Sequence, residues 1–194
     1  MDPLADQDKL RKVLSGQSME LCNFLQNVVA ITYIFGLQQP TFLLCNFLHL
    51  YSATNNERCG YYGELLVLKA QELGLNTCWA ALTHGRSKAV IGADEKEVIV
   101  IALGYGKTQG IEHKSKKLSD VSNISADAPV WFKRGVKAAI LAPTAVNQQK
   151  FRFERKGNTV TAKAGRIGPC LKIDLGIVKC HFEIGAGKEN FIWG

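Results

Sequence analysis

The feature that most constrains the fold is a continuous β-branched run, "EVIVIAL", at residues 97–103. Apolar residues at successive positions leave no polar face, and such runs are typical of strands that are buried on both faces of a sheet. The segment "GYG" at 104–106 follows directly and is predicted to end the strand. The sequence therefore predicts a sheet that contains this strand in its interior.

A helix is predicted shortly before this strand. In "GYYGELLVLKAQEL" (60–73) the apolar residues recur at the spacing of one buried helical face, namely Tyr62, Leu65, Leu66, Ala70 and Leu73. Gly74 suits the left-handed residue that closes such a helix, and residues 75–82 are then predicted to be extended. A short polar helix is also predicted over 5–15.

The second half of the chain mixes helices and strands. Asp127 is predicted to cap a helix that has Pro129 in its first turn and runs to about Leu141. Asp174 is predicted to cap the last helix, within "LGIVKCHFEIG". The polar and basic segment 107–125 is predicted to be a surface loop.

Two alternating runs around "KGN" predict a β-hairpin with Gly157 and Asn158 at its turn. Because helices and strands intermingle without strict βαβ alternation, the predicted class is α+β. A faint echo between "YYGELLVLKAQELGLNT" and "DLGIVKCHFEIGAGKEN" suggests two related halves within the chain.

Composition narrows the class of protein and its partners. Hydrophobic residues at 46% and charged residues at 21% are ordinary globular values, and one domain is expected at this length. The formal net charge is +7, and residues 1–60 contribute none of the excess. Without an Arg-rich run or a nucleic-acid motif, this charge favours a phosphorylated small molecule as partner, with nucleic acid as the weaker alternative. Asn, Gln and Pro interrupt the apolar stretch 21–51 too often for a membrane span, so no membrane contact is predicted.

The cysteine pattern points to a reducing compartment. The six cysteines form no CxxC pair and no metal-ligand spacing, and the histidines show no HxH or HxxxH spacing. Nothing resembles a secretory signal. We therefore predict reduced thiols in a cytoplasmic protein that binds no metal. The cysteines are Cys22, Cys45, Cys59, Cys78, Cys170 and Cys180.

The segment "APTAVNQQ" (142–149) is the first candidate for a ligand site. Pro143 stops the preceding helix, which releases the backbone N–H groups of 144–147. Free N–H groups beside Thr, Asn and Gln side chains supply the donors and acceptors that a planar heterocycle with carbonyls and ring nitrogens requires. The alternative is a helix stop followed by a polar turn, and the residues alone leave both open.

Two further segments carry weaker signals. "HKSKK" (113–117) places Lys114, Ser115, Lys116 and Lys117 where they could hold a phosphate, although a solvated basic loop explains the same residues. The glycines of "GYG" allow a close approach of the backbone to a ligand, and Tyr105 could line a pocket. No Walker-type loop, GxGxxG or GxSxG motif is present.

The string "GLNTCW", "LGYG", "KSKK" and "APTAVNQQ", in this order, resembles the FMN-dependent nitroreductase family, in particular its putative TM-type branch. The resemblance covers about residues 51–193 and implies a nitroreductase-like α+β domain over 51–194, with a central, mostly antiparallel sheet flanked by helices. It also implies noncovalent FMN, NADH or NADPH as electron donor, and a nitroaromatic, quinone or similar small molecule as acceptor. One chain would then enclose a pseudo-dimer, or two chains would form a homodimer.

The resemblance also implies which residues hold the cofactor. Thr144, Asn147 and Gln149 would face the flavin, and Pro143 and Ala145 would shape their turn. Trp79 would lie near the ring, with the Ala81 backbone N–H near flavin N5, and no catalytic acid or base would be needed. The strand end Gly104, Tyr105 and Gly106 would flank the cofactor, and Lys114 and Lys116 would contact its phosphate.

The N-terminal part departs from the family pattern. Family members usually begin with an Arg-rich "RRSxRxF" segment that grips the FMN phosphate, and residues 1–50 contain nothing like it. They are therefore predicted to be an atypical segment, either part of the same domain or poorly ordered. The "APTAVNQQ" segment also follows the "GYG" strand here, whereas it precedes that strand in ordinary members. A flavin-binding protein with little turnover and a basic nucleic-acid scaffold are the alternative functions.

Overall fold

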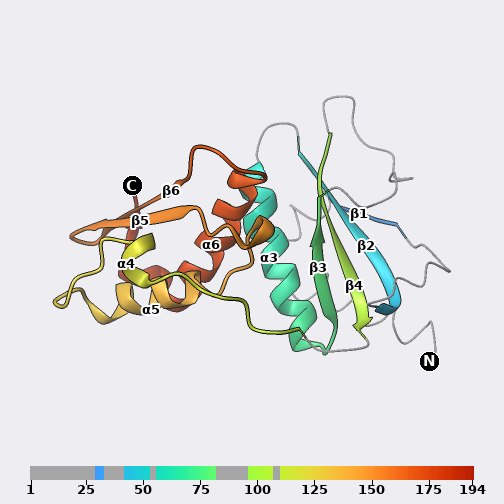
Figure 1. Ribbon diagram of the computed structural model, residues 1–194, viewed down its shortest axis with the longest axis horizontal. Helices are drawn as coiled ribbons and strands as arrows, with labels where there is room; N and C mark the ends of the chain where they lie inside the picture. The colour runs from blue at the N-terminus through green and yellow to red at the C-terminus, as the bar shows by residue number, and fades with distance from the viewer. Residues whose placement is uncertain (1–28, 33–41, 53–55, 82–95, 107–109) are drawn as a thin grey trace. The chain divides into compact units, whose positions relative to one another are not determined.

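A computed structural model of the 194-residue chain describes residues 29–32, 42–52, 56–81, 96–106 and 110–194 (Figure 1). The chain divides into two compact units: Met1–Asn55 with Tyr62–Ile111, and Asn56–Tyr61 with Glu112–Gly194. The helix predicted over 5–15 and most of the atypical segment predicted over 1–50 lie outside the described residues. A mixture of helices and strands is confirmed. The described residues form two small sheets. The central sheet and the two related halves stay predictions.

The first unit contains a four-stranded antiparallel sheet in the order β1-β2-β4-β3. Its strands are β1 (Val29–Thr32), β2 (Phe42–Ser52), β3 (Asn76–Ala80) and β4 (Lys96–Gly106). Strand β4 is an interior strand, paired with both β2 and β3, and its residues from Ile99 to Leu103 are at most 6% exposed. The prediction of a buried strand inside a sheet is confirmed.

The prediction that "GYG" ends this strand is wrong, because β4 continues to Gly106. Gly104 pairs with both Cys45 and Asn76, since ladder hydrogen bonds use the backbone and need no side chain. The Gly106 N–H then donates to Oδ1 of Asn76 at 2.9 Å, which satisfies the end of the strand.

Helix α3 (Asn56–Glu72) confirms the helix predicted over 60–73, although it starts earlier. Gly74 has φ +77° and the Leu75 N–H donates to the carbonyl of Ala70 at 2.9 Å, so the helix closes through a left-handed glycine as predicted. The extended segment predicted after it is β3.

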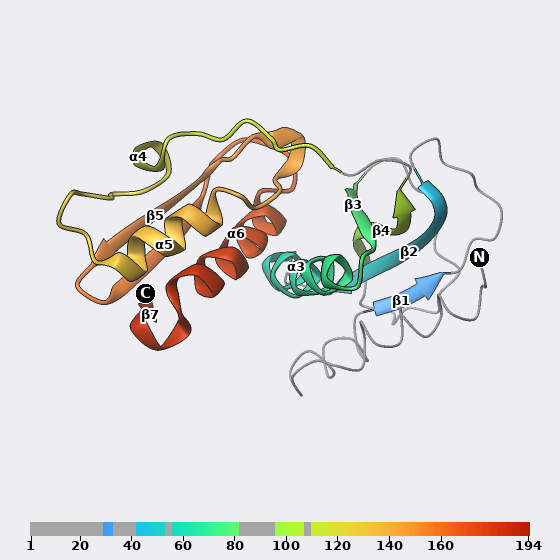
Figure 2. The same ribbon diagram turned by 90° about the horizontal axis from the view of Figure 1, so that it is seen from below.

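The second unit packs helices against a small sheet of β5, β6 and β7 (Figures 1 and 2). Phe153 of the sheet stacks on Phe182 of α6 at 4.6 Å, and Phe132 of α5 meets the same ring edge-on at 5.9 Å. All three rings are fully buried and form the centre of the core. The elements are α4 (Leu118–Val121), α5 (Val130–Ala139), β5 (Phe151–Lys156), β6 (Thr159–Ala164), α6 (Leu171–Ala186) and β7 (Ile192–Trp193).

Two glycines let helices approach closely in this unit. A Cβ at Gly135 of α5 would lie 2.7 Å from the Phe182 ring of α6. A Cβ at Gly176 of α6 would overlap the carbonyl oxygen of Glu57 and lie 2.6 Å from the amide nitrogen of Tyr61. The start of α3 therefore packs backbone to backbone on α6.

Both predicted helix caps are wrong. Helix α5 starts at Val130 with Pro129 as its N-cap, not with Asp127. A helix capped by Asp127 would place Ala128 in a helical conformation, which the following proline disfavours. Helix α6 starts at Leu171 after Cys170, so Asp174 lies inside the first turn rather than before it.

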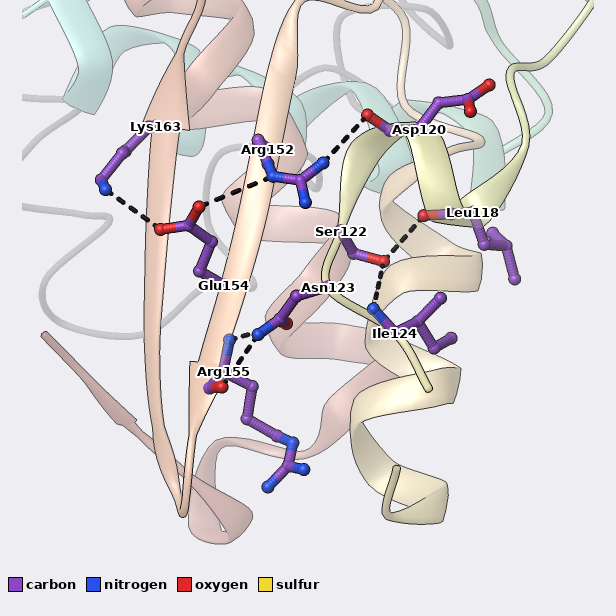
Figure 3. Close-up of polar contacts among 9 residues, drawn as sticks. All are labelled: Leu118, Asp120, Ser122, Asn123, Ile124, Arg152, Glu154, Arg155 and Lys163. Atoms are coloured by element: carbon purple, nitrogen blue, oxygen red, sulfur yellow. Dashed lines mark hydrogen bonds and ion pairs between the residues drawn. The ribbon is translucent and has the colours of Figure 1, made fainter. Parts of the chain in front are cut away.

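The segment 107–125 is not wholly a loop, because it contains α4, while residues 107–109 lie outside the described part. Figure 3 shows how this segment closes one edge of β5. Ser122 forms a parallel bridge with Phe153, and the Asn123 side chain both accepts from the Arg155 N–H at 2.9 Å and donates to the Arg155 carbonyl at 3.0 Å. The β5–β6 hairpin is confirmed, with Gly157 at φ +60°.

No helix among the described residues has the length and apolar character that a membrane span requires. In the same part of the chain, no group of three His, Cys, Asp or Glu side chains is arranged to hold a metal ion.

Candidate functional site

The segment 143–149, here named the amide turn, has an unusual backbone. It contains a single 3-10 turn, Ala145–Asn147, between α5 and β5. Val146, Asn147 and Gln149 have φ values of 47°, 51° and 46°. Left-handed conformations of residues other than glycine cost about 1–3 kcal/mol each and persist only where the surroundings enforce them. A β-branched residue such as Val146 is especially uncommon there. The turn is therefore held by contacts outside itself.

One anchor of the amide turn is Asp174 in the first turn of α6. Its Oδ1 accepts the Ala145 N–H at 3.0 Å and its Oδ2 accepts Nε2 of Gln148 at 2.6 Å. Asp174 is only 5% exposed. Burial raises the pKa of the Asp174 carboxyl, and the two hydrogen bonds oppose that rise only in part.

The side-chain amide of Gln148 is fixed in one orientation. Its Nε2 donates both to Asp174 and to the carbonyl of Pro169, the latter at 2.7 Å. A flipped amide would place an oxygen against two acceptors. The Oε1 atom is left buried with no hydrogen-bond partner. Gln148 therefore orders the turn at the expense of one unsatisfied acceptor.

A second anchor is the basic segment 113–117. The carbonyl of Lys114 accepts Nδ2 of Asn147 at 3.0 Å and Nε2 of Gln149 at 2.8 Å. The Lys116 N–H donates to Oε1 of Gln149 at 2.8 Å, and the Lys116 ammonium donates to the carbonyls of Gln148 and Gln149, each at 3.0 Å. The structure thus brings together the two segments for which the sequence predicts flavin and phosphate contacts.

The polar side chains of this cluster differ in exposure and in the hydrogen-bonding groups that remain available to a ligand. Gln149 is 2% exposed, and its Nε2 also donates to Oδ1 of Asn147 at 2.7 Å, so both of its amide protons are used internally. Asn147 and the Lys114 side chain are exposed, and Val146 is 86% exposed. Thr144 accepts the Gln149 N–H at 3.0 Å on its hydroxyl oxygen, which leaves the hydroxyl proton to donate. Within the turn, Val146 and Asn147 are the exposed residues, and Thr144 is half-buried.

The remaining predicted residues lie in the first unit, on β3, on β4 and just after β3. Trp79 pairs with Ile101, and its Nε1 donates to Oε2 of Glu64 at 3.2 Å, where Glu64 is 1% exposed. Gly104 pairs with Asn76 at the opposite end of β3. With a rise of about 3.3 Å per residue, the end of β3 at Ala80 is roughly 13 Å along the strand from that pair, and Ala81 follows it. The structure does not bring Trp79 and Ala81 together with the strand end 104–106.

Sequence reasoning missed three features of this cluster. The sequence pattern does not single out Gln148, it predicts Asp174 as a helix cap, and it gives no sign of the two carbonyls to which the Lys116 ammonium donates. One signal was available for Asp174, since "KIDLGIV" places a carboxylate inside an apolar helical run. A carboxylate that is buried there needs hydrogen-bond donors from another segment.

Comparisons with known proteins agree with the resemblance. A family model described as "Putative TM nitroreductase" matches residues 36–186, which include every predicted site residue. Among solved structures, the chain is similar to a crystal structure of a "putative nitroreductase" from Thermotoga maritima, with a TM-score of 0.63 and 20% identity over 97% of this chain and 76% of that one. At this identity the likeness shows a shared fold. No curated protein matches the sequence. The chain therefore belongs to the "Putative TM nitroreductase" family, which indicates an oxidoreductase.

Proposed function

We propose that this protein is an FMN-dependent oxidoreductase that transfers hydride from NADH or NADPH to a nitroaromatic, a quinone or a similar small acceptor. The observation that carries the proposal is the family match over residues 36–186, because it spans both the amide turn and the basic segment 113–117. The internal hydrogen bonds of Gln148 and Gln149 hold the amide turn in one conformation, which supports a binding surface that is formed before the ligand arrives.

The chemistry of the amide turn fits the cofactor. FMN has a phosphate dianion and a ring whose polar edge alternates carbonyl oxygens and nitrogens. Lys114 offers an exposed ammonium, and Lys116 keeps one of its three ammonium protons after donating to two carbonyls. Asn147 and Thr144 offer an amide and a hydroxyl that can both donate and accept. The exposed side chain of Val146 provides apolar contact beside them.

Each residue then has a distinct task. FMN, when bound, supplies the two-electron hydride chemistry, and no acid or base from the chain is needed for it. Lys114 and Lys116 would hold the phosphate, while Thr144 and Asn147 would orient the ring edge or the ribityl chain. Gln148 and Gln149 would keep the turn rigid, which reduces the entropy lost on binding. The contributions of Trp79, Ala81 and the 104–106 segment stay predictions from the resemblance.

Spectroscopy of the purified protein tests the proposal directly. We expect flavin absorbance bands in the fresh protein, or a spectral change when the apo-protein is titrated with FMN. Ligand at a hundredfold excess over Kd should stabilise the fold by about 2.7 kcal/mol, and the melting temperature should rise accordingly. If saturating FMN changes neither the spectrum nor the melting temperature, the proposal fails. Binding without steady-state oxidation of NADH or NADPH would instead support a flavin-binding protein without turnover.

A matched pair of lysine variants tests the phosphate contact. Lys114→Gln removes an exposed cation beside the amide turn, and Lys117→Gln removes an exposed cation three residues further along. Loss of a charge-assisted phosphate contact at an exposed position should weaken FMN binding about tenfold. We expect that loss for Lys114→Gln alone, measured by fluorescence titration at fixed ionic strength. Equal, small losses in both variants would mean that only the general positive charge attracts FMN.

A further inference from the structure

Asp174 is a buried carboxylate to which the proposed chemistry gives no direct role. It projects from the first turn of α6 between Ile173 and Leu175, which are 4% and 8% exposed. Its two hydrogen-bond partners, the Ala145 N–H and the Gln148 amide, are neutral and come from a segment 26 to 29 residues earlier in the sequence. A carboxylate in such surroundings contributes little to stability, because desolvation disfavours its charge.

No neighbouring cation among the described residues offsets the cost of burying the Asp174 carboxylate. The Cys170 thiol lies one helical turn before it, and burial together with the Asp174 charge raises the pKa of that thiol. Within the described residues, Asp174 forms no ion pair with Lys, Arg or His. The negative charge of Asp174 is stabilised only by the positive N-terminal end of the α6 dipole and by its two neutral hydrogen-bond donors. The carboxylate is therefore held by geometry rather than by a cation.

The Asp174 carboxylate joins two parts of the amide turn. Ala145 and Gln148 are the two ends of the short turn that contains Val146 and Asn147, both in left-handed conformations. One oxygen binds each end, so the carboxylate bridges the turn and fixes the distance between its ends. Val146 and Asn147, which are both exposed, lie between the two bridged ends. A strained turn of this kind requires such an external restraint.

We propose that Asp174 is the positioning residue of the amide turn: its carboxylate bridges Ala145 and Gln148 and so presents Asn147 and Thr144 to a bound flavin. The role of Asp174 toward FMN rests on the proposed function, whereas its hold on the turn does not. Asp174 itself touches no ligand in this scheme and acts through the conformation of residues 144–147.

The test compares Asp174→Asn with Asp120→Asn. The first variant keeps the shape of the side chain but turns one acceptor toward Gln148 into a donor. Asp120 is a suitable control because it also lies in the first turn of a helix in the same unit, yet is exposed. Hydrogen exchange of the peptide spanning 142–150 is measured in the apo-protein, together with its melting temperature and its Kd for FMN.

For Asp174→Asn we expect faster exchange within 142–150 and a Kd for FMN about tenfold higher, with the apo-protein melting at the wild-type temperature or above. A purely structural role would lower the melting temperature and the affinity together. Asp120→Asn should change none of the three. Gln148→Met provides a second route, because it removes the other side of the same bridge. Its effect on Kd should add little to that of Asp174→Asn in the double variant.

The outcomes separate the two proposals. Unchanged exchange in both Asp174→Asn and Gln148→Met overturns the positioning role, whether or not FMN binds. Faster exchange with a wild-type Kd overturns the role toward the flavin. If the wild-type protein binds no FMN, the proposed function fails and the role toward the flavin fails with it, while faster exchange still supports the hold of Asp174 on the turn.

Discussion

Asn147 provides the sharpest test of the amide turn as a flavin site, because its contribution to the apo-protein can be separated from its contribution to binding. The residue has φ 51° and is exposed. Asn147→Gly removes the amide and keeps the backbone conformation, since glycine adopts this region freely. Asn147→Ala removes the amide and adds the strain of a left-handed alanine, about 1–2 kcal/mol.

The structure limits what the apo-protein loses. The carbonyl of Lys114 keeps Nε2 of Gln149 as a donor at 2.8 Å when Asn147 is removed. The Gln149 amide proton that donated to Oδ1 of Asn147 can be reached by water through the space that the exposed Asn147 side chain leaves. The expected loss in Asn147→Gly is about 0.5–1 kcal/mol. For a protein of this size that lowers the melting temperature by about 1–4 °C, and Asn147→Ala should lose a few degrees more.

Binding should respond more strongly. One amide contact to the flavin is worth about 1–1.5 kcal/mol, so Kd for FMN should rise roughly tenfold in both variants. Differential scanning fluorimetry of the apo-protein and fluorescence titration with FMN give the two numbers. Asn158→Gly, at the exposed hairpin turn, is the control for loss of an exposed asparagine and should leave Kd unchanged. A wild-type Kd in Asn147→Gly would refute the placement of this amide at the flavin and return the segment to a structural turn.

Two further predictions concern stability. Gly176→Ala should lower the free energy of unfolding by about 1–3 kcal/mol, because the new Cβ meets backbone atoms of Glu57 and Tyr61. Gly110→Ala, where a Cβ meets nothing within 4 Å, should cause no loss in a parallel denaturant titration, and equal effects would contradict the close packing of the start of α3 on α6. For Asp174, the raised pKa means that the folded state binds its proton more tightly than the unfolded state, so wild-type stability falls as pH rises from the ordinary Asp pKa through the raised one. Asp174→Asn removes this decline, and the gain in melting temperature over wild type should grow across that window; a gain that is constant with pH would show that Asp174 does not titrate there.

Local patterns predicted the elements well where neighbouring residues determine them. The "EVIVIAL" run became β4, the apolar face at 60–73 became α3, and "KGN" became the turn of the β5–β6 hairpin. Errors arose where a local signal competed with another. The proline at 129 excluded the start that Asp127 indicated, and the pairing of β4 with β2 continued the strand through both glycines to Gly106.

The sequence by itself determined which residues carry polar groups at 142–149 and 113–117, and that a helix ends before them, although α5 ends at Ala139, four residues before Pro143. Only the tertiary structure decided how those groups are used. Gln149 and Gln148 turn inward to Lys114 and Asp174, whereas Asn147 stays exposed. These partners lie 26 to 35 residues apart, so no local pattern encodes them. Packing decides, because a buried amide or carboxylate must find its hydrogen bonds wherever the fold brings donors and acceptors together.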